Sequence, residues 1–369
     1  MLVSQFEIPG LPEEGVFGNL RHVPSWLDDD QEDVAWNDAA WDEGARQKWR
    51  DWRKRLIEFR DWVHEAAATN GSIQREQTAL CKADVKYFLA VYGWMFEPRD
   101  HVDPDYPDKG WRVWALLPHQ VWLLDEIVEA LKYPSPQGDI VVEKSRDMGA
   151  TWTFCGWSAH RWLFDRDFTA GLMSYREAEV VEDHPDSMLF KVKSILGIEP
   201  DVPGLPGWLF PEVMPNGDFF IRKKELDHKA TLRQPSRTNF LRGETMTKLA
   251  GTGNRTFARI HDEAAKWMVG LRTVMTNTES VTSHRFVLSS AYIEFSDDFK
   301  RYVDYAREAH QRASERGEVA MAPRLIRLEA KLHPLHDDNW LIRKRANAEA
   351  NNDIEGFERE VLINYRPGS

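Results

Sequence analysis

One segment of the chain combines a cation, a glycine and a hydroxyl in an order that binds phosphate. It reads K-S-R-D-M-G-A-T over residues 144–151, after an apolar Ile-Val-Val run and before a stretch with helical character. A strand, a tight loop and a helix in this order form a phosphate-binding loop, whose consensus is G-x-x-x-x-G-K-S/T. Gly149 and Thr151 match the second glycine and the hydroxyl, whereas Lys144 replaces the first glycine and Ala150 the lysine. The segment therefore predicts a phosphate site whose cation comes from an unusual position.

Two cations, Lys144 and Arg146, stand at the start of this loop, and either could contact the β- and γ-phosphates of a nucleotide. Backbone N–H groups at the start of a helix bind phosphate whatever the side chains are. Gly149 allows close approach of the backbone, and Thr151 supplies a hydroxyl for Mg²⁺. The alternative is an ordinary strand-to-helix turn that contains a glycine. The predicted nucleotide-binding residues of the loop are Lys144, Ser145, Arg146, Asp147, Met148, Gly149, Ala150, Thr151 and Trp152.

A second strand-like segment, residues 256–261, ends in the adjacent carboxylates Asp262 and Glu263. Because side chains alternate along a strand, we expect the two carboxylates to point in different directions. That separation suits Asp262 as the Mg²⁺ residue and Glu263 as the base that orients and deprotonates the attacking water. A solvated helix start is the alternative interpretation of the pair.

Two other segments could complete such a site. Ser289 and Ser290 end a further strand-like segment, where hydroxyls beside the γ-phosphate position could sense hydrolysis. Gln120 follows a proline at the start of a helix, and its amide has an acceptor and donors that can pair with an adenine edge.

The elements that must position these residues alternate between helix and strand, which predicts an α/β fold with a mainly parallel, doubly wound sheet. We expect helices at 120–131, 151–164, 177–196, 300–316 and 339–350, strands at 140–142, 168–173, 256–261, 285–289 and 323–329, and a hairpin of 219–222 with 229–233.

The N-terminal part of the chain has a different pattern. Residues 1–35 are rich in Pro, Gly and acidic side chains and predict an extended or flexible arm. Residues 36–110 predict a helical subdomain, with helices at 36–68 and 83–92 and a loop dense in Pro and Asp at 98–110. Residues 111–369 would form the core.

Composition limits the class of protein. The net charge of −12 does not favour a protein that coats nucleic acid along its whole surface, although a local basic track remains compatible with it. The two cysteines favour neither a disulfide framework nor a zinc site. We find no membrane helix and no secretion signal, so we expect an intracellular protein.

The motifs resemble those of tailed-bacteriophage large terminases, specifically the N-terminal packaging ATPase domain. K-S-R-x-x-G-x-S/T, with the cation ahead of the loop, resembles their deviant Walker A motif, although Asp147 and Ala150 depart from the commonest residues there. D-E-A-A after a strand resembles their Walker B motif, R-F-V-L-S-S-A their coupling motif, and the Gln120 segment their adenine-reading glutamine. The resemblance covers residues 80–369.

The resemblance implies a P-loop NTPase of the ASCE, RecA-like class that uses ATP and Mg²⁺ to move double-stranded DNA into a procapsid. The implied partners are the portal protein, the small terminase subunit and further copies of the chain in a ring, in the host cytoplasm. Arg255, with Arg242 as the alternative, would complete the site of a neighbouring subunit. The RNase H-like nuclease of whole large terminases is expected beyond residue 369, so we expect no nuclease activity within the chain.

Two other functions fit some of the same motifs. A helicase-like translocase would share the glutamine, loop and acidic pair, but the residues after Ser290 are too few for a second RecA-like domain. A degenerate, non-catalytic scaffold would explain Ala150, but it would have no use for both Asp262 and Glu263.

Overall fold

The computed structural model describes residues 43–99, 110–182, 184–198, 204–209, 221–224, 229–234, 238–245, 255–292 and 297–365. The arm predicted at residues 1–35 and most of the loop predicted at 98–110 lie outside this part of the chain.

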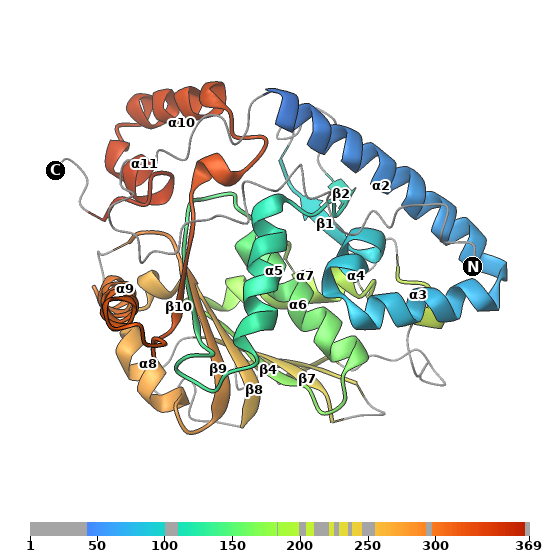
Figure 1. Ribbon diagram of the computed structural model, residues 1–369, viewed down its shortest axis with the longest axis horizontal. Coiled ribbons are helices and arrows are strands. Elements are labelled where there is room, and N and C mark those ends of the chain that lie inside the picture. The colour runs from blue at the N-terminus through green and yellow to red at the C-terminus, as the bar shows by residue number, and fades with distance from the viewer. Residues whose placement is uncertain are drawn as a thin grey trace.

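An eight-stranded sheet forms the centre of the molecule, in the order β10-β3-β9-β8-β4-β7-β6-β5 (Figure 1). The first six strands are parallel, and the last two are antiparallel at one edge. The mainly parallel α/β sheet and the hairpin predicted from the sequence are therefore confirmed. The strands are β3 (Ile140–Lys144), β4 (Thr169–Ser174), β5 (Ile221–Lys224), β6 (Lys229–Arg233), β7 (Phe240–Thr245), β8 (Thr256–Asp262), β9 (Thr282–Ser289) and β10 (Arg324–Leu328).

Helices cover both faces of the sheet because its strands are apolar on both sides. Along β3, Ile140 and Val142 face a large core with α5 (Pro118–Ala130), α6 (Ala150–Phe164) and α7 (Met188–Ile195). Val141 faces the opposite core, where α8 (Leu271–Thr278) and α9 (Asp298–Arg316) pack. The chain ends with α10 (Asp338–Ala350) and α11 (Ile354–Glu360), which pack together.

The N-terminal lobe consists of α2 (Glu43–Thr69), α3 (Gly71–Ala83), α4 (Val85–Tyr92) and the antiparallel pair β1 (Trp94–Glu97) and β2 (Gly110–Val113). Its tryptophans, such as Trp49 and Trp52, join the same apolar core as α5 and α6. The lobe is therefore packed on the sheet domain and shares its core. Figure 1 shows α2 running along the outside of this lobe.

The structure differs from the predicted elements in several places, and helices α8 and α11 are among those that were not predicted. The predicted helix at 177–196 is limited to a 3-10 turn, Glu177–Glu179, and α7, because Pro185 lies between them and lacks a backbone N–H. Helix α3 was not predicted; Asn70 starts it by accepting from the backbone N–H groups of Ser72 and Ile73. Strands β1, β2 and β7 were also missed, since four to six residues carry little periodic signal.

A buried ion pair fixes the start of the phosphate-loop strand. Asp139, which precedes β3, accepts from the backbone N–H of Arg285 on β9 at 2.8 Å and from its Nε at 2.8 Å. It also accepts from the Ser135 hydroxyl at 2.9 Å. Asp139 is fully buried and Arg285 nearly so, so the pair ties two central strands together in a medium where an unpaired charge is costly.

We predict that Asp139→Ala lowers the free energy of unfolding by about 3 kcal/mol, because it leaves the buried Arg285 guanidinium without its carboxylate. Denaturant unfolding followed by circular dichroism measures the change. The control is Glu129→Ala, which removes an exposed carboxylate that pairs with Lys132 on the surface. Equal stability of the two variants would contradict the role given to the buried pair.

Candidate nucleotide site

The ends of three central strands meet at one edge of the sheet. In the parallel register, Glu143 of β3 pairs with Ser289 of β9, and Asp262 of β8 pairs with Leu288 of β9. The loop after β3, the acidic pair after β8 and the predicted coupling serines therefore lie side by side. Carboxyl ends of parallel strands are the usual place for ligand sites in α/β sheets.

The loop between β3 and α6 turns through two left-handed residues, Asp147 at φ 66° and Gly149 at φ 68°. Gly149 is the N-cap of α6, so the helix begins at Ala150 with its N-terminus toward the loop. A Cβ on residue 149 would lie 2.4 Å from Nε2 of Gln120. Gly149 is thus required by the backbone conformation and by the close approach of this amide.

The hydroxyl and carboxylate predicted to hold Mg²⁺ are in contact. Oγ1 of Thr151 donates to Oδ2 of Asp262 at 3.0 Å, while Oδ1 of Asp262 is buried without a hydrogen-bond partner among the described residues. Burial raises the pKa of Asp262, an effect that the nearby Lys144 ammonium opposes. Mg²⁺ binds hydroxyl and carboxylate oxygens together with nucleotide phosphates. The Thr151 hydroxyl and the Asp262 carboxylate, with its unused Oδ1, therefore fit this ion.

The other carboxylate is held by two lysines. Lys144 Nζ contacts Oε1 of Glu263 at 2.8 Å, and Lys266 Nζ contacts Oε2 at 2.8 Å. Burial alone would raise the pKa of Glu263, but the two ammonium groups outweigh it and lower the pKa to about 2. Burial alone would likewise lower the pKa of Lys144, but the two carboxylates raise it. The site therefore holds a charged base beside a charged lysine.

The two carboxylates diverge, but not by strand alternation as predicted from the sequence. Strand β8 ends at Asp262, and Glu263 has a left-handed backbone, φ 51° and ψ 39°. A non-glycine residue in this conformation is uncommon and clusters at functional sites. The turn directs Glu263 toward Lys144 and Lys266, while Asp262 stays with Thr151.

The structure separates the two candidate cations of the loop. The side chain of Arg146 is 59% exposed and forms a two-point ion pair with Glu360 of α11, at 2.9 and 3.0 Å. The side chain of Lys144 is 13% exposed and lies between the loop and the acidic pair. Lys144 is therefore the cation that faces the predicted metal and base residues, whereas Arg146 anchors the loop to the C-terminal helices.

A third ionic link involves Asp147, at the tip of the loop. Its carboxylate accepts from Nη1 of Arg99, next to β1, at 3.0 Å and from Nζ of Lys344, on α10, at 3.2 Å. The two cations lower its pKa against the effect of burial. The loop is thus tied to the N-terminal lobe and to α10, by residues that no local sequence pattern indicates.

The remaining loop and coupling residues are buried. Met148 turns its carbonyl to Nε2 of His119 at 2.8 Å, and the Trp152 ring packs edge-on against another tryptophan. Ser145 is buried, with its backbone N–H bonded to β10. Ser289 Oγ accepts from the backbone N–H of Ala265 at 3.1 Å, which links the end of β9 to the turn after Glu263. Ser290 is also buried there.

The two predicted arginines lie away from this edge. Arg255 is exposed just before β8, so the full length of the strand, roughly 23 Å, separates it from Asp262. Arg242 lies within β7, with Nε 3.5 Å from Glu244. Neither reaches the acidic pair of its own chain, so a role for Arg255 in a neighbouring subunit stays a prediction.

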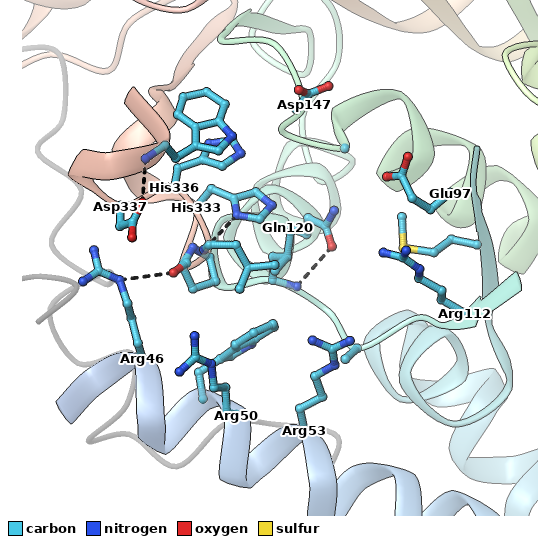
Figure 2. A pocket seen from close by; sticks show the side chains of 18 of the residues that line it. Arg46, Arg50, Arg53, Glu97, Arg112, Gln120, Asp147, His333, His336 and Asp337 are labelled. Carbon is cyan, nitrogen blue, oxygen red and sulfur yellow. Dashed lines mark hydrogen bonds between the residues drawn. The ribbon is translucent and has the colours of Figure 1, made fainter. Parts of the chain in front are cut away.

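A cavity of about 750 Å³ adjoins the loop at Asp147 and Gly149. Figure 2 shows Arg46, Arg50 and Arg53 on the α2 side of this cavity and Gln120 and His333 across from them. Arg46 closes one end by donating from Nε to the carbonyl of Pro334 at 3.2 Å. Along the wall, His336 stacks on both His333 and Trp340.

The strand order, the loop between β3 and α6 and the acidic pair after β8 are those of the P-loop NTPase fold of ASCE, RecA-like type that the sequence predicted. No family model and no curated protein matches the sequence. Similar solved structures include the large terminase of a thermophilic bacteriophage in complex with ADP, at 10% identity and a TM-score of 0.42 over 65% of this chain and 53% of that one.

The large terminase of bacteriophage HK97 is 12% identical, with a TM-score of 0.44 over 70% of this chain and 52% of that one. The Phi-28 gp11 DNA packaging motor is 10% identical, with a TM-score of 0.33 over 68% and 69%. The chain spans about half the length of the two large terminases. No helix among the described residues is long and apolar enough to cross a membrane.

Proposed function

We propose that the chain is the ATP-hydrolysing motor of viral double-stranded DNA packaging. The observation that carries the proposal is the pair of contacts across the sheet edge, Lys144 with Glu263 and Thr151 with Asp262. They bring together the four residue types that phosphoryl transfer to water requires: a phosphate cation, a hydroxyl and a carboxylate for the metal, and a base. A non-catalytic scaffold would not need this combination.

Each residue has a distinct role in the proposed reaction. Thr151 and Asp262 would hold Mg²⁺, which neutralises the charge that develops on the phosphates. The N-terminus of α6 binds phosphate oxygens through its backbone N–H groups. Lys144 exchanges its contact with Glu263 for one with the phosphates. Glu263, still held by Lys266, orients the attacking water and accepts its proton.

The motor acts as a ring at the portal of a procapsid in the host cytoplasm, with double-stranded DNA, the portal protein and the small terminase subunit as partners. Within the ring, the exposed Arg255 of one subunit completes the site of its neighbour. Ser289, bonded to the turn after Glu263, passes the state of the phosphates to β9.

We predict that the rate of Mg²⁺-ATP hydrolysis per chain rises with protein concentration, and that Arg255→Ala lowers the high-concentration rate at least tenfold, because the transition-state arginine comes from a neighbour. Phosphate release across a concentration series measures this. The control is Arg316→Ala, an exposed arginine at the end of α9. A rate per chain that does not depend on protein concentration would contradict the proposed ring. Absence of ATP turnover at every concentration would contradict the proposed ATPase activity.

A further inference from the structure

A buried histidine joins the phosphate-binding loop to the turn after β10. His119, the second residue of α5, is fully buried, and its ring contacts two backbone carbonyl oxygens. Its Nε2 lies 2.8 Å from the carbonyl of Met148 in the loop, and its Nδ1 lies 3.2 Å from the carbonyl of Leu332. Leu332 ends the 3-10 turn Ala330–Leu332 that follows β10. His119 can therefore act on a ligand of the loop only through the loop itself.

The ring of His119 can donate to only one of these carbonyls at neutral pH. Burial lowers the pKa of His119 to about 4, an effect that the two carbonyls oppose, so the ring is neutral at pH 7. A neutral imidazole has one N–H, and a carbonyl oxygen cannot donate in return. The shorter contact assigns this proton to Nε2, which donates to Met148, while the Nδ1 lone pair faces Leu332 across the longer distance. The one donor of the ring is thus committed to the loop.

The bond to Met148 fixes the direction of the next peptide group. In a trans peptide the C=O of one residue and the N–H of the next point in opposite directions. A Met148 carbonyl that faces His119 therefore directs the N–H of Gly149 away from the histidine. Asp147 and Gly149 are left-handed, and turns of this kind aim backbone N–H groups into a concavity that binds anions. Gly149 is also the N-cap of α6, and the N-terminus of a helix binds phosphate through its N–H groups.

We propose that His119 is a positioning residue that orients the Gly149 peptide and so sets the affinity of the loop for phosphate. This role rests on the proposed nucleotide-hydrolysing function and adds to it a residue that does not contact the nucleotide. Without a donor at the place of Nε2, the Met148 carbonyl loses its partner, and the peptide between residues 148 and 149 can turn over to find another. A turned peptide presents a carbonyl oxygen, which repels phosphate, where the N–H of Gly149 stood.

Two substitutions separate the two contacts of the ring. In His119→Gln the amide nitrogen takes the place of Nε2 and keeps a donor for Met148, whereas in His119→Asn it takes the place of Nδ1 and keeps a donor for Leu332. The probe is inorganic tripolyphosphate with Mg²⁺, which has no base or ribose, in competition with a fluorescent ADP analogue. We expect His119→Gln to bind it within about threefold of the wild type and His119→Asn about tenfold more weakly, the effect of one hydrogen bond. The affinity for ATP should fall in His119→Asn by the same factor.

His310→Asn is the matched control. His310 also contacts a backbone carbonyl through Nε2, that of Pro323 at 2.8 Å, but it lies on α9 and not beside the loop. We expect this variant to bind tripolyphosphate as the wild type does, and denaturant unfolding checks that each variant is folded under the assay conditions.

Two results would overturn the role of His119 alone: unchanged tripolyphosphate affinity in His119→Asn, or a tenfold loss in folded His119→Gln. The second result decides whether or not His119→Asn folds. If the wild type binds neither tripolyphosphate nor any nucleotide at millimolar concentration, the proposed function is overturned as well.

Discussion

Glu263→Gln should lower the kcat for ATP by about 10³ and leave the affinity for ATP equal or higher. An amide of the same shape cannot accept a proton from the attacking water, and general-base catalysis contributes about 10²–10⁴ in rate. The substitution also frees Lys144, which in the wild type is held by the Glu263 carboxylate at 2.8 Å. The freed lysine can turn to the phosphates without breaking an ion pair. Steady-state phosphate release and nucleotide binding measure the two effects separately.

Glu360→Gln is the matched control, because it makes the same change on the partner of Arg146 outside the acidic pair. We expect it to alter kcat by less than about fivefold, since it weakens an exposed anchor of the loop. If Glu263→Gln hydrolyses ATP at the wild-type rate, Glu263 is not the base. Equal losses in the two variants would mean that loop anchoring, and not proton transfer, limits turnover.

Lys144→Met should lower kcat/KM for ATP by about 10²–10³, the range found when one preorganised donor to a transition-state oxygen is removed. The side chain is nearly buried, and the neighbouring loop cation cannot readily replace it because that arginine is held on α11. Methionine keeps the length and the apolar stem, so packing in the strand end is preserved. The loss therefore reports the ammonium group.

Arg146→Met is the comparison that decides between the two cations. We expect a loss of a few-fold, because this arginine contacts Glu360 and contributes to the placement of the loop. The reverse order, an inactive Arg146→Met and an active Lys144→Met, would assign the phosphate role to Arg146 and require the arginine to leave Glu360 on nucleotide binding.

The sequence predicted those parts of the site that local chemistry determines. The strand, loop and helix at residues 140–164 and the strand before Asp262 were visible because apolar runs, a glycine and a hydroxyl follow one another along the chain. The choice between Lys144 and Arg146 was not visible, since it depends on Glu360, which reaches the loop only through the fold.

The same distinction explains the other differences. The divergence of Asp262 and Glu263 was expected from strand alternation, but it results from the left-handed backbone of Glu263. The sequence did not indicate this conformation, because the position holds neither glycine nor asparagine, the residues that adopt it most readily. The side-chain oxygen of Gln120 accepts from the indole of Trp114 at 3.1 Å, a bond that depends on how the two side chains pack and that no local sequence pattern indicates. Lys266 could have been recognised from its spacing to Glu263, as the sequence places it one helical turn later.

The two salt bridges of Asp147 affect how deletions of the N-terminal lobe must be interpreted. Arg99 belongs to that lobe, and Lys344 belongs to a helix near the other end of the chain. A truncation before β2 removes Arg99 and so leaves Asp147 of the phosphate-binding loop with only the salt bridge to Lys344. Loss of activity in such a truncation therefore does not show that the lobe grips DNA or another protein. Restoring a cation beside Asp147 in the truncated chain would separate loss of this salt bridge from loss of a binding surface on the lobe.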